Sequence, residues 1–268
     1  MIDAHIELHC DHSDADLQDL LDQLAQDIEF SGVDQVLAVQ RQADVKLNAP
    51  LMKLAADSDD LIAGCVTWIP ISSGQIKAYL DEDSHRPLVR GYQETFRADD
   101  PDFDYGVHEI THTGKTLELF IEPTRLPEMI AFADKHPSQR FIVDFGYHGA
   151  SQKIPLPDTD VWARQIRELA RRPQVFHRLS SLANLLEGQS EVQQTESVQD
   201  HFDTLLSAFT PERIMYGSGW SMGLSQTSYP NWLSTVDNLI HALSDFEKRA
   251  IYHYTAAEFY QLESPTGM

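Results

Sequence analysis

Short apolar runs rich in β-branched residues alternate with longer stretches of helical periodicity from the second residue onward. Eight of these runs are predicted strands, at residues 2–8, 35–39, 61–69, 88–94, 116–121, 140–145, 175–179 and 213–218. Strands separated by helices pair in parallel through right-handed crossovers, and eight such units in about 250 residues match a (β/α)8 barrel. The prediction is one α/β domain over residues 1–262, a (β/α)8 TIM barrel with extra C-terminal helices, and a frayed tail over residues 263–268.

Amphipathic patterns predict the helices that separate these strands. The clearest pattern covers residues 16–30, where Leu17, Leu21 and Leu24 share one stripe. Further helices are expected at residues 126–135, 160–172, 198–209, 232–243, 245–254 and 255–260. Residues 187–197 are polar and lack an apolar period, which predicts a surface loop. A doubly wound open sheet is the alternative fold, but residues 8–15 contain no glycine for its phosphate-binding turn.

The charge of the chain restricts its partners. Twenty Lys and Arg against 42 Asp and Glu give a net charge of -22 at pH 7, which repels nucleic acids and anionic lipid surfaces. Two cysteines, Cys10 and Cys65, are too few for a disulfide framework. No secretory signal or membrane-spanning run is evident. We expect a cytoplasmic protein that binds a small molecule and neither nucleic acid nor membrane; oligomeric state is not readable from these features.

Polar residues that finish the predicted strands are the first site candidates, because parallel barrels carry their chemistry on the C-terminal face. His5 and Glu7 lie two positions apart in the first strand, so their side chains point the same way. We expect both at the barrel mouth, since a strand packed under helices would bury an unpaired carboxylate there. Asp144 ends the sixth strand. The alternative to a catalytic role is a hydrogen bond from His5 to Glu7 or Asp144 that only ties strand ends together.

Several residues near strand ends are candidates for substrate contact. Trp68, Tyr92 and Trp220 would make the mouth apolar, although such side chains also fill barrel cores. His148 follows the sixth strand and could contact the substrate or take a proton from it.

A family resemblance runs through almost the whole chain in a consistent order. It is carried by Ile2-Asp3-Ala4-His5 and by the segments 64–68, 141–144, 175–182, 211–218 and 256–260. These segments resemble the amidohydrolase-2 branch of the metal-dependent hydrolases, which includes sugar-lactonases and pyrone-dicarboxylate lactonases. The resemblance implies a TIM barrel and a hydrolase that acts on a cyclic ester.

The chain departs from the family pattern at positions that carry chemistry. The family's His-x-His, Gly-x-Arg, Asp-His, Gly-Ser-Asp-Trp and Asn-Ala motifs are here His5-Ile6-Glu7, Gly91-Tyr92-Gln93, Asp144-Phe145, Gly217-Ser218-Gly219-Trp220 and Thr255-Ala256. Gln93 thus occupies a substrate-binding position of the family, and Arg178 occupies that of a lysine on the seventh strand. Arg178 would suit an anionic group of the substrate or pair with Asp144 or Glu7.

These departures from the family pattern affect whether a metal is bound and which residue acts as the general base. His5 and Glu7 supply two metal ligands where a mononuclear site usually needs three, so a divalent metal there is disfavoured and no cofactor is expected. Gly219 can neither hold a metal nor take a proton from water. Glu7 or a histidine would then act as base, with His5 and Arg178 polarising or binding the substrate. The two hypotheses are a lactonase-like hydrolase with a rebuilt site and an inactive barrel that binds a small molecule or a protein.

Two further motifs contain residue types that can bind a metal. His108 and His112 lie in a His-Glu-x-x-His pattern like that of zinc proteases, but the apolar stripe of this segment predicts that both face solvent. His9, Cys10 and His12 are good ligand types in the first loop, where contiguous polar residues are usually solvated. Neither motif is expected to bind a metal.

Overall fold

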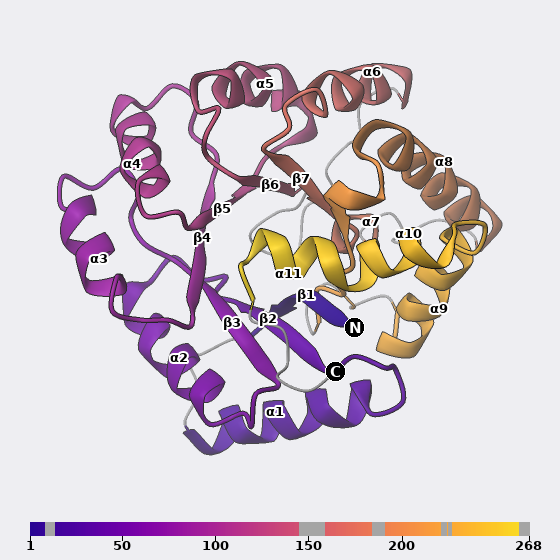
Figure 1. The fold of residues 1–268 in the computed structure, drawn as a ribbon, viewed down its shortest axis with the longest axis horizontal. Helices are drawn as coiled ribbons and strands as arrows, with labels where there is room; N and C mark the ends of the chain where they lie inside the picture. Colours follow the sequence, from indigo (N-terminus) through magenta and orange to yellow (C-terminus); the bar gives the residue numbers. More distant parts are fainter. Residues whose placement is uncertain (9–13, 145–158, 184–190, 221–223, 225–226, 263–268) are drawn as a thin grey trace.

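A computed structural model of the chain describes residues 1–8, 14–144, 159–183, 191–220, 224 and 227–262. Eight strands in these residues follow one another around a barrel, each parallel to the next. They are β1 (Ile2–Glu7), β2 (Gln35–Val39), β3 (Ile62–Thr67), β4 (Val89–Thr95), β5 (Thr116–Phe120), β6 (Phe141–Asp144), β7 (Val175–Arg178) and β8 (Ile214–Met215). The Ala4 N–H donates to the Tyr216 carbonyl at 3.0 Å, which brings the last strand against the first. The predicted TIM barrel is therefore confirmed (Figure 1).

Helices surround the barrel, and they include four, at residues 48–56, 76–83, 101–111 and 180–183, that were not among those predicted (Figure 1). They are α1 (Asp14–Ile28), α2 (Asn48–Ala56), α3 (Ile76–Asp83), α4 (Pro101–Thr111), α5 (Leu126–Lys135), α6 (Thr159–Leu169), α7 (Ser180–Ala183), α8 (Glu191–Phe209), α9 (Tyr229–Leu239), α10 (Asp245–Arg249) and α11 (Thr255–Phe259). None of the helices described is long and apolar enough to cross a bilayer. The tail at residues 263–268 lies outside the described residues.

The surface loop predicted for residues 187–197 is wrong from Glu191 onward, because α8 begins there. The apolar stripe of this helix starts at Val198, so its first turns carry no periodicity that a sequence pattern could detect. Glu and Gln are frequent in those turns of the sequence, and both residue types favour helix formation because they lose little side-chain freedom in a helix.

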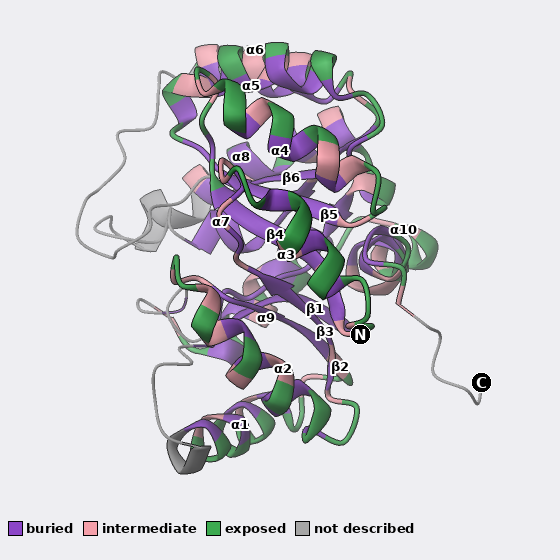
Figure 2. Cartoon of the chain, turned by 90° about the vertical axis from the view of Figure 1, so that its left-hand side faces the viewer, coloured by how far each residue is buried: buried purple, intermediate pink, exposed green. Residues whose placement is uncertain are grey.

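The barrel interior is closed at the N-terminal ends of the strands by α11. Ala256, Phe259 and Tyr260 join one cluster with inward-facing strand residues, namely Ile2, Ala4, Leu37, Val39, Val66, Ile142 and Met215. Arg90 and Arg140 donate to the carbonyls of Gln261 and Glu258 at 3.0 and 3.2 Å, which ties strands β4 and β6 to this plug. Figure 1 shows α11 lying across the middle of the barrel, and Figure 2 shows the buried strands behind the half-exposed helices. Any open mouth must therefore lie at the opposite, C-terminal face.

Gly91 sits where β4 approaches β5 too closely for a side chain. A Cβ there would lie 2.1 Å from Thr116 Oγ1 and 2.8 Å from the Thr116 carbonyl oxygen. We expect Gly91→Ala to lower the free energy of unfolding by about 1 to 3 kcal/mol, measured by urea titration, since backbone must move to relieve the overlap. Gly74→Ala is the control, because nothing lies within 4 Å of its added Cβ. Equal stability of the two variants would contradict the close approach.

Candidate active site

His5 and Glu7 lie together at the barrel mouth, as predicted from their spacing. The pairing of β1 with β2 is irregular between Asp3 and Ile6, where the His5 N–H donates to Asp3 Oδ1 at 3.0 Å. Beyond this irregularity both His5 and Glu7 are buried. His5 Nε2 lies 3.1 Å from Glu7 Oε1, and His5 Nδ1 lies 2.8 Å from the hydroxyl of Ser180, the first residue of α7. The imidazole is thus held between a carboxylate and a hydroxyl.

Glu7 is also paired with Arg41, which follows β2. The Arg41 guanidinium lies 5.5 Å from the ring centre of Phe120, at the end of β5, and its side chain is 21% exposed. Burial by itself raises the pKa of Glu7, but the His5 ring and the Arg41 guanidinium outweigh it and hold the pKa below its usual value. Glu7 is therefore ionised at neutral pH.

Beneath this pair lies a fully buried ionic cluster around Arg178. Its guanidinium contacts Glu118 at 2.8 Å and Asp144 at 2.9 Å, and Tyr260 of the plug donates to Glu118. Burial raises the pKa of Asp144, yet Arg178 and His5 more than offset this and lower it. Both terminal nitrogens of the Arg178 guanidinium are bonded to these carboxylates, so the structure favours the pairing role predicted for it over contact with substrate.

Gly217, after the end of β8, has no side chain and so allows Arg178 and His5 to lie close to the backbone of this turn. A Cβ at Gly217 would lie 2.8 Å from Arg178 Cγ and 3.1 Å from His5 Cβ, so a side chain there would displace both residues. The Gly219 N–H donates to the His5 carbonyl at 2.8 Å, with a φ of 71° that favours glycine. Ser218 hydrogen-bonds to Asp3 and His5 within the same turn, which fits a structural role.

The remaining predicted substrate contacts have mixed outcomes. Gln93 is buried and donates to the Gln40 carbonyl at 2.7 Å, and within the described residues its Oε1 has no hydrogen-bond partner. Trp68 is half-buried, and its backbone is held by Asn48. His148 and Phe145 lie outside the described residues.

Two aromatic positions predicted at the mouth are wrong. Tyr92 packs in the outer core between strands and helices, where Asp83 of α3 interacts with its hydroxyl. Trp220 packs in the same core, and its indole N–H donates to Asp27 of α1 at 2.7 Å. The reason at Tyr92 is an irregular pairing, in which Cys65 faces Val89 and Val66 faces Gly91, so that one extra residue shifts the alternation of β4.

The other histidines considered as site residues lie away from the mouth where the structure describes them. His177 stacks on Phe209 of α8, with ring centres 5.9 Å apart, and burial lowers its pKa to about 4. His108 and His112 are exposed, as expected. The cluster of His9, Cys10 and His12 lies outside the described residues.

Arg41 and Ser180 are the two residues at this mouth that sequence reasoning missed. Arg41 follows Leu37 and Val39 at even spacing, and these two face the barrel interior, so strand alternation could have identified it. Ser180 lies beyond the last residue of β7, where alternation no longer predicts side-chain direction.

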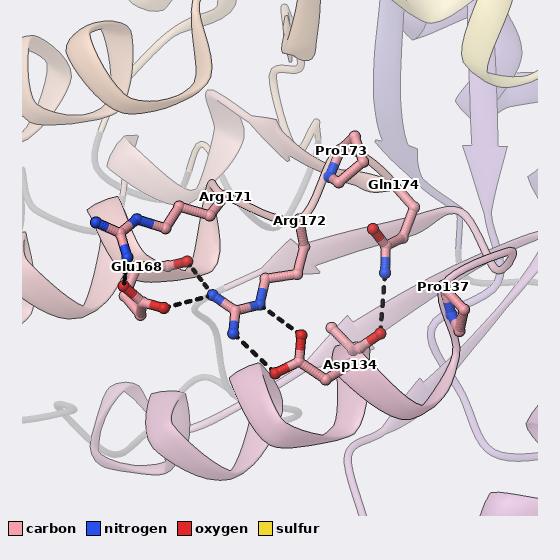
Figure 3. Close-up of a pocket in the computed structure, with 8 residues that line it drawn as sticks. Asp134, Pro137, Glu168, Arg171, Arg172, Pro173 and Gln174 are labelled. Carbon is pink, nitrogen blue, oxygen red and sulfur yellow. Dashed lines mark hydrogen bonds and ion pairs between the residues drawn. The ribbon is translucent and has the colours of Figure 1, made fainter.

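A separate hollow of about 370 Å³ lies between α5 and α6, next to the N-terminal ends of β6 and β7. Figure 3 shows Arg172 bonded to Asp134 and Glu168 there. The charged residues drawn there are paired with one another, and the hollow lies on the face opposite the mouth. We therefore assign it no catalytic role.

The model of the Amidohydrolase family (amidohydrolase 2) matches residues 11–262. The chain belongs to this amidohydrolase family. Among relatives, an L-fucono-1,5-lactonase of Burkholderia multivorans is 28% identical over 242 residues, which are 85% of this chain and 81% of the relative. An L-fucono-1,5-lactonase of Burkholderia ambifaria is 23% identical over 88% of this chain and 83% of the relative.

Solved structures of the family share the fold of this chain. An amidohydrolase from Burkholderia multivorans with bound zinc has a TM-score of 0.84 at 25% identity, covering 98% of this chain and 99% of that one. A probable 2-pyrone-4,6-dicarboxylic acid hydrolase from Acinetobacter baumannii, with citric acid bound, has a TM-score of 0.73 at 12% identity, over 97% and 99% of the two chains. This second likeness concerns the fold alone.

The described residues of this mouth do not fit a metal ion like the zinc of that relative. Within the described part of the chain, no three His, Cys, Asp or Glu side chains are grouped to hold one. Of the two carboxylates at this mouth, Glu7 on β1 is already paired with Arg41, and Asp144 on β6 is paired with Arg178. A metal at Glu7 would have to displace or repel a guanidinium.

Removing Arg178 should destabilise the protein strongly, because two carboxylates would be left buried without a counter-charge. We expect Arg178→Met to lower the free energy of unfolding by about 3 to 5 kcal/mol in urea titration. Arg171→Met is the control, since its ion pair with Glu168 is on the surface and is worth about 1 kcal/mol or less. Similar losses in both variants would contradict the central role of Arg178.

His177 predicts a pH dependence of stability. Its pKa is about 4 in the folded state and near 6.5 when unfolded, so the unfolded state binds more protons between these values. Stability should fall as pH drops from about 6.5 to about 4, and His177→Gln should reduce this fall by up to about 3 kcal/mol. The measurement is urea unfolding at several pH values. The exposed His108→Gln should keep the wild-type slope, and an unchanged slope in His177→Gln would refute the assignment.

Proposed function

We propose that this amidohydrolase relative is a lactonase-like hydrolase, which adds water to a cyclic ester to give a hydroxy acid. The observation that carries the proposal is the buried His5 imidazole, held at the C-terminal mouth between Glu7 and Ser180. A histidine with an ionised carboxylate on one ring nitrogen is suited to accept a proton during attack on a carbonyl. The names of the L-fucono-1,5-lactonase relatives support the substrate class.

In this proposal His5 is the general base and Glu7 orients it. Glu7 is a poor base itself, because its pKa is held below the usual value by His5 and Arg41. It can instead stabilise the imidazolium that forms when His5 takes a proton. Asp144, which also interacts with the His5 charge, adds to this stabilisation while Arg178 holds it in place.

Arg41 and Gln93 are the proposed substrate contacts. The Arg41 side chain is partly exposed at the mouth, and its guanidinium would donate hydrogen bonds to the carbonyl or hydroxyl oxygens of the lactone. Gln93 presents its buried Oε1, which has no hydrogen-bond partner among the described residues and could accept one from a sugar hydroxyl. Trp68 and His148 remain proposed contacts of the same substrate.

No metal takes part in the proposed reaction, because Glu7 and Asp144, the carboxylates that could bind one, are already paired with Arg41 and Arg178. It places the protein in the cytoplasm, where its small number of cysteines would stay reduced.

Proton release in a weakly buffered indicator solution tests the activity. We expect the protein to hydrolyse L-fucono-1,5-lactone or a related aldono-lactone, and His5→Ala to lose roughly 10²- to 10⁴-fold in rate. His108→Ala, a substitution of an exposed histidine, should keep the wild-type rate.

Absence of proton release from the wild-type protein over a panel of aldono-lactones and pyrone carboxylates, with and without added Zn²⁺, would contradict the proposal. The inactive barrel that binds a small molecule or a protein would then be the better description.

A further inference from the structure

Ser180, His5 and Glu7 form a continuous row across the mouth. The Ser180 hydroxyl lies 2.8 Å from His5 Nδ1, and His5 Nε2 lies 3.1 Å from Glu7 Oε1. All three side chains are buried. A hydroxyl within hydrogen-bond reach of an imidazole, whose other nitrogen faces a carboxylate, is the arrangement that activates serine as a nucleophile.

The protonation states of this row are consistent with that role. Ser180 can donate its hydroxyl proton only if Nδ1 carries a lone pair, which places the ring proton of neutral His5 on Nε2, facing Glu7. Glu7 stays ionised because His5 and Arg41 both contact its Oε1 and together lower its pKa. A positive charge that forms on His5 is therefore next to a negative one.

The neighbouring serine shows that the contact is specific to Ser180. Ser181 hydrogen-bonds to His177 at 3.1 Å and to the Arg178 carbonyl. His177 faces Phe209 of α8, outside the barrel. Two adjacent serines thus meet two different histidines, and Ser180 is the one that meets a histidine at the mouth.

We propose that Ser180 is the nucleophile of this site and forms an acyl-enzyme; this rests on the proposed lactonase function. The Ser180 oxygen attacks the lactone carbonyl while its proton passes to His5 Nδ1. The ring C–O bond then breaks, and His5 returns the proton to the ring oxygen, which becomes a hydroxyl. The whole substrate is now attached to Ser180 as an ester.

Water completes the reaction. It attacks the ester carbonyl, His5 takes one proton from it, and the C–O bond to Ser180 breaks as that proton returns to the serine oxygen. The net change is lactone plus water to hydroxy acid, with no other reactant. The position that resembles the family's aspartate is Gly219, and this route needs no carboxylate there.

This route also predicts reaction with open-chain esters, because the nucleophile does not depend on a ring. We therefore expect p-nitrophenyl acetate to acetylate the wild-type protein, with release of p-nitrophenol equal to the enzyme concentration before steady turnover. L-Fucono-1,5-lactone, quenched in acid during turnover, should add the mass of one intact lactone. Peptide mapping should place both groups on Ser180.

Paired serine variants provide the decisive comparison. Ser180→Ala should abolish both adducts and lower lactone hydrolysis by roughly 10³-fold or more. Ser181→Ala should keep the adducts and the rate to within about threefold, because its hydroxyl contacts His177 instead. Ser180→Cys, which retains a nucleophile, should still be acetylated, and this separates loss of chemistry from loss of folding.

The outcomes distinguish the two proposals. Lactone hydrolysis in Ser180→Ala at near the wild-type rate, or acetylation that maps to another residue, overturns the nucleophile and leaves the lactonase function standing. Absence of hydrolysis by the wild-type protein overturns the lactonase function, and with no lactone adduct it overturns the nucleophile as well.

Discussion

The buried guanidinium of Arg178 is the interaction on which the interior of this barrel depends. It neutralises Glu118 and Asp144 in a space closed to water, and Tyr260 links the same cluster to the helix that plugs the barrel. Each carboxylate would be costly to bury alone, so the three charges require one another. Asp144 is thereby fixed beside His5, which connects the stability of the lower barrel to the geometry of the mouth.

A second ion pair, between Glu7 and Arg41, sets the chemistry above this cluster. Glu7 stands where the family pattern has a histidine, and its partner is a guanidinium. Glu7 is kept ionised beside His5, so a positive charge that forms on the imidazole lies next to a carboxylate.

Much of the site could be predicted from strand alternation and family resemblance, and the failures have identifiable causes. His5 and Glu7 share a face because they are two residues apart, and this held despite the irregular pairing in β1. Simple alternation of side chains does not hold as far as Tyr92, because one extra residue in β4 reverses the direction of the side chains beyond it. Trp220 is drawn outward by a hydrogen bond to Asp27, nearly 200 residues away in the chain.

The amino-acid sequence by itself determined the eight strand segments, the order of strands and helices, and the presence of His5, Glu7 and Asp144 at strand ends, because these depend on local periodicity and composition. Only the tertiary structure decided which partner each charge has. The pairings of Glu7 with Arg41, of Asp144 with Arg178 and of His5 with Ser180 join residues from 34 to 175 positions apart. Barrel closure brings residues that are far apart in the sequence into contact, and local sequence patterns do not predict such contacts.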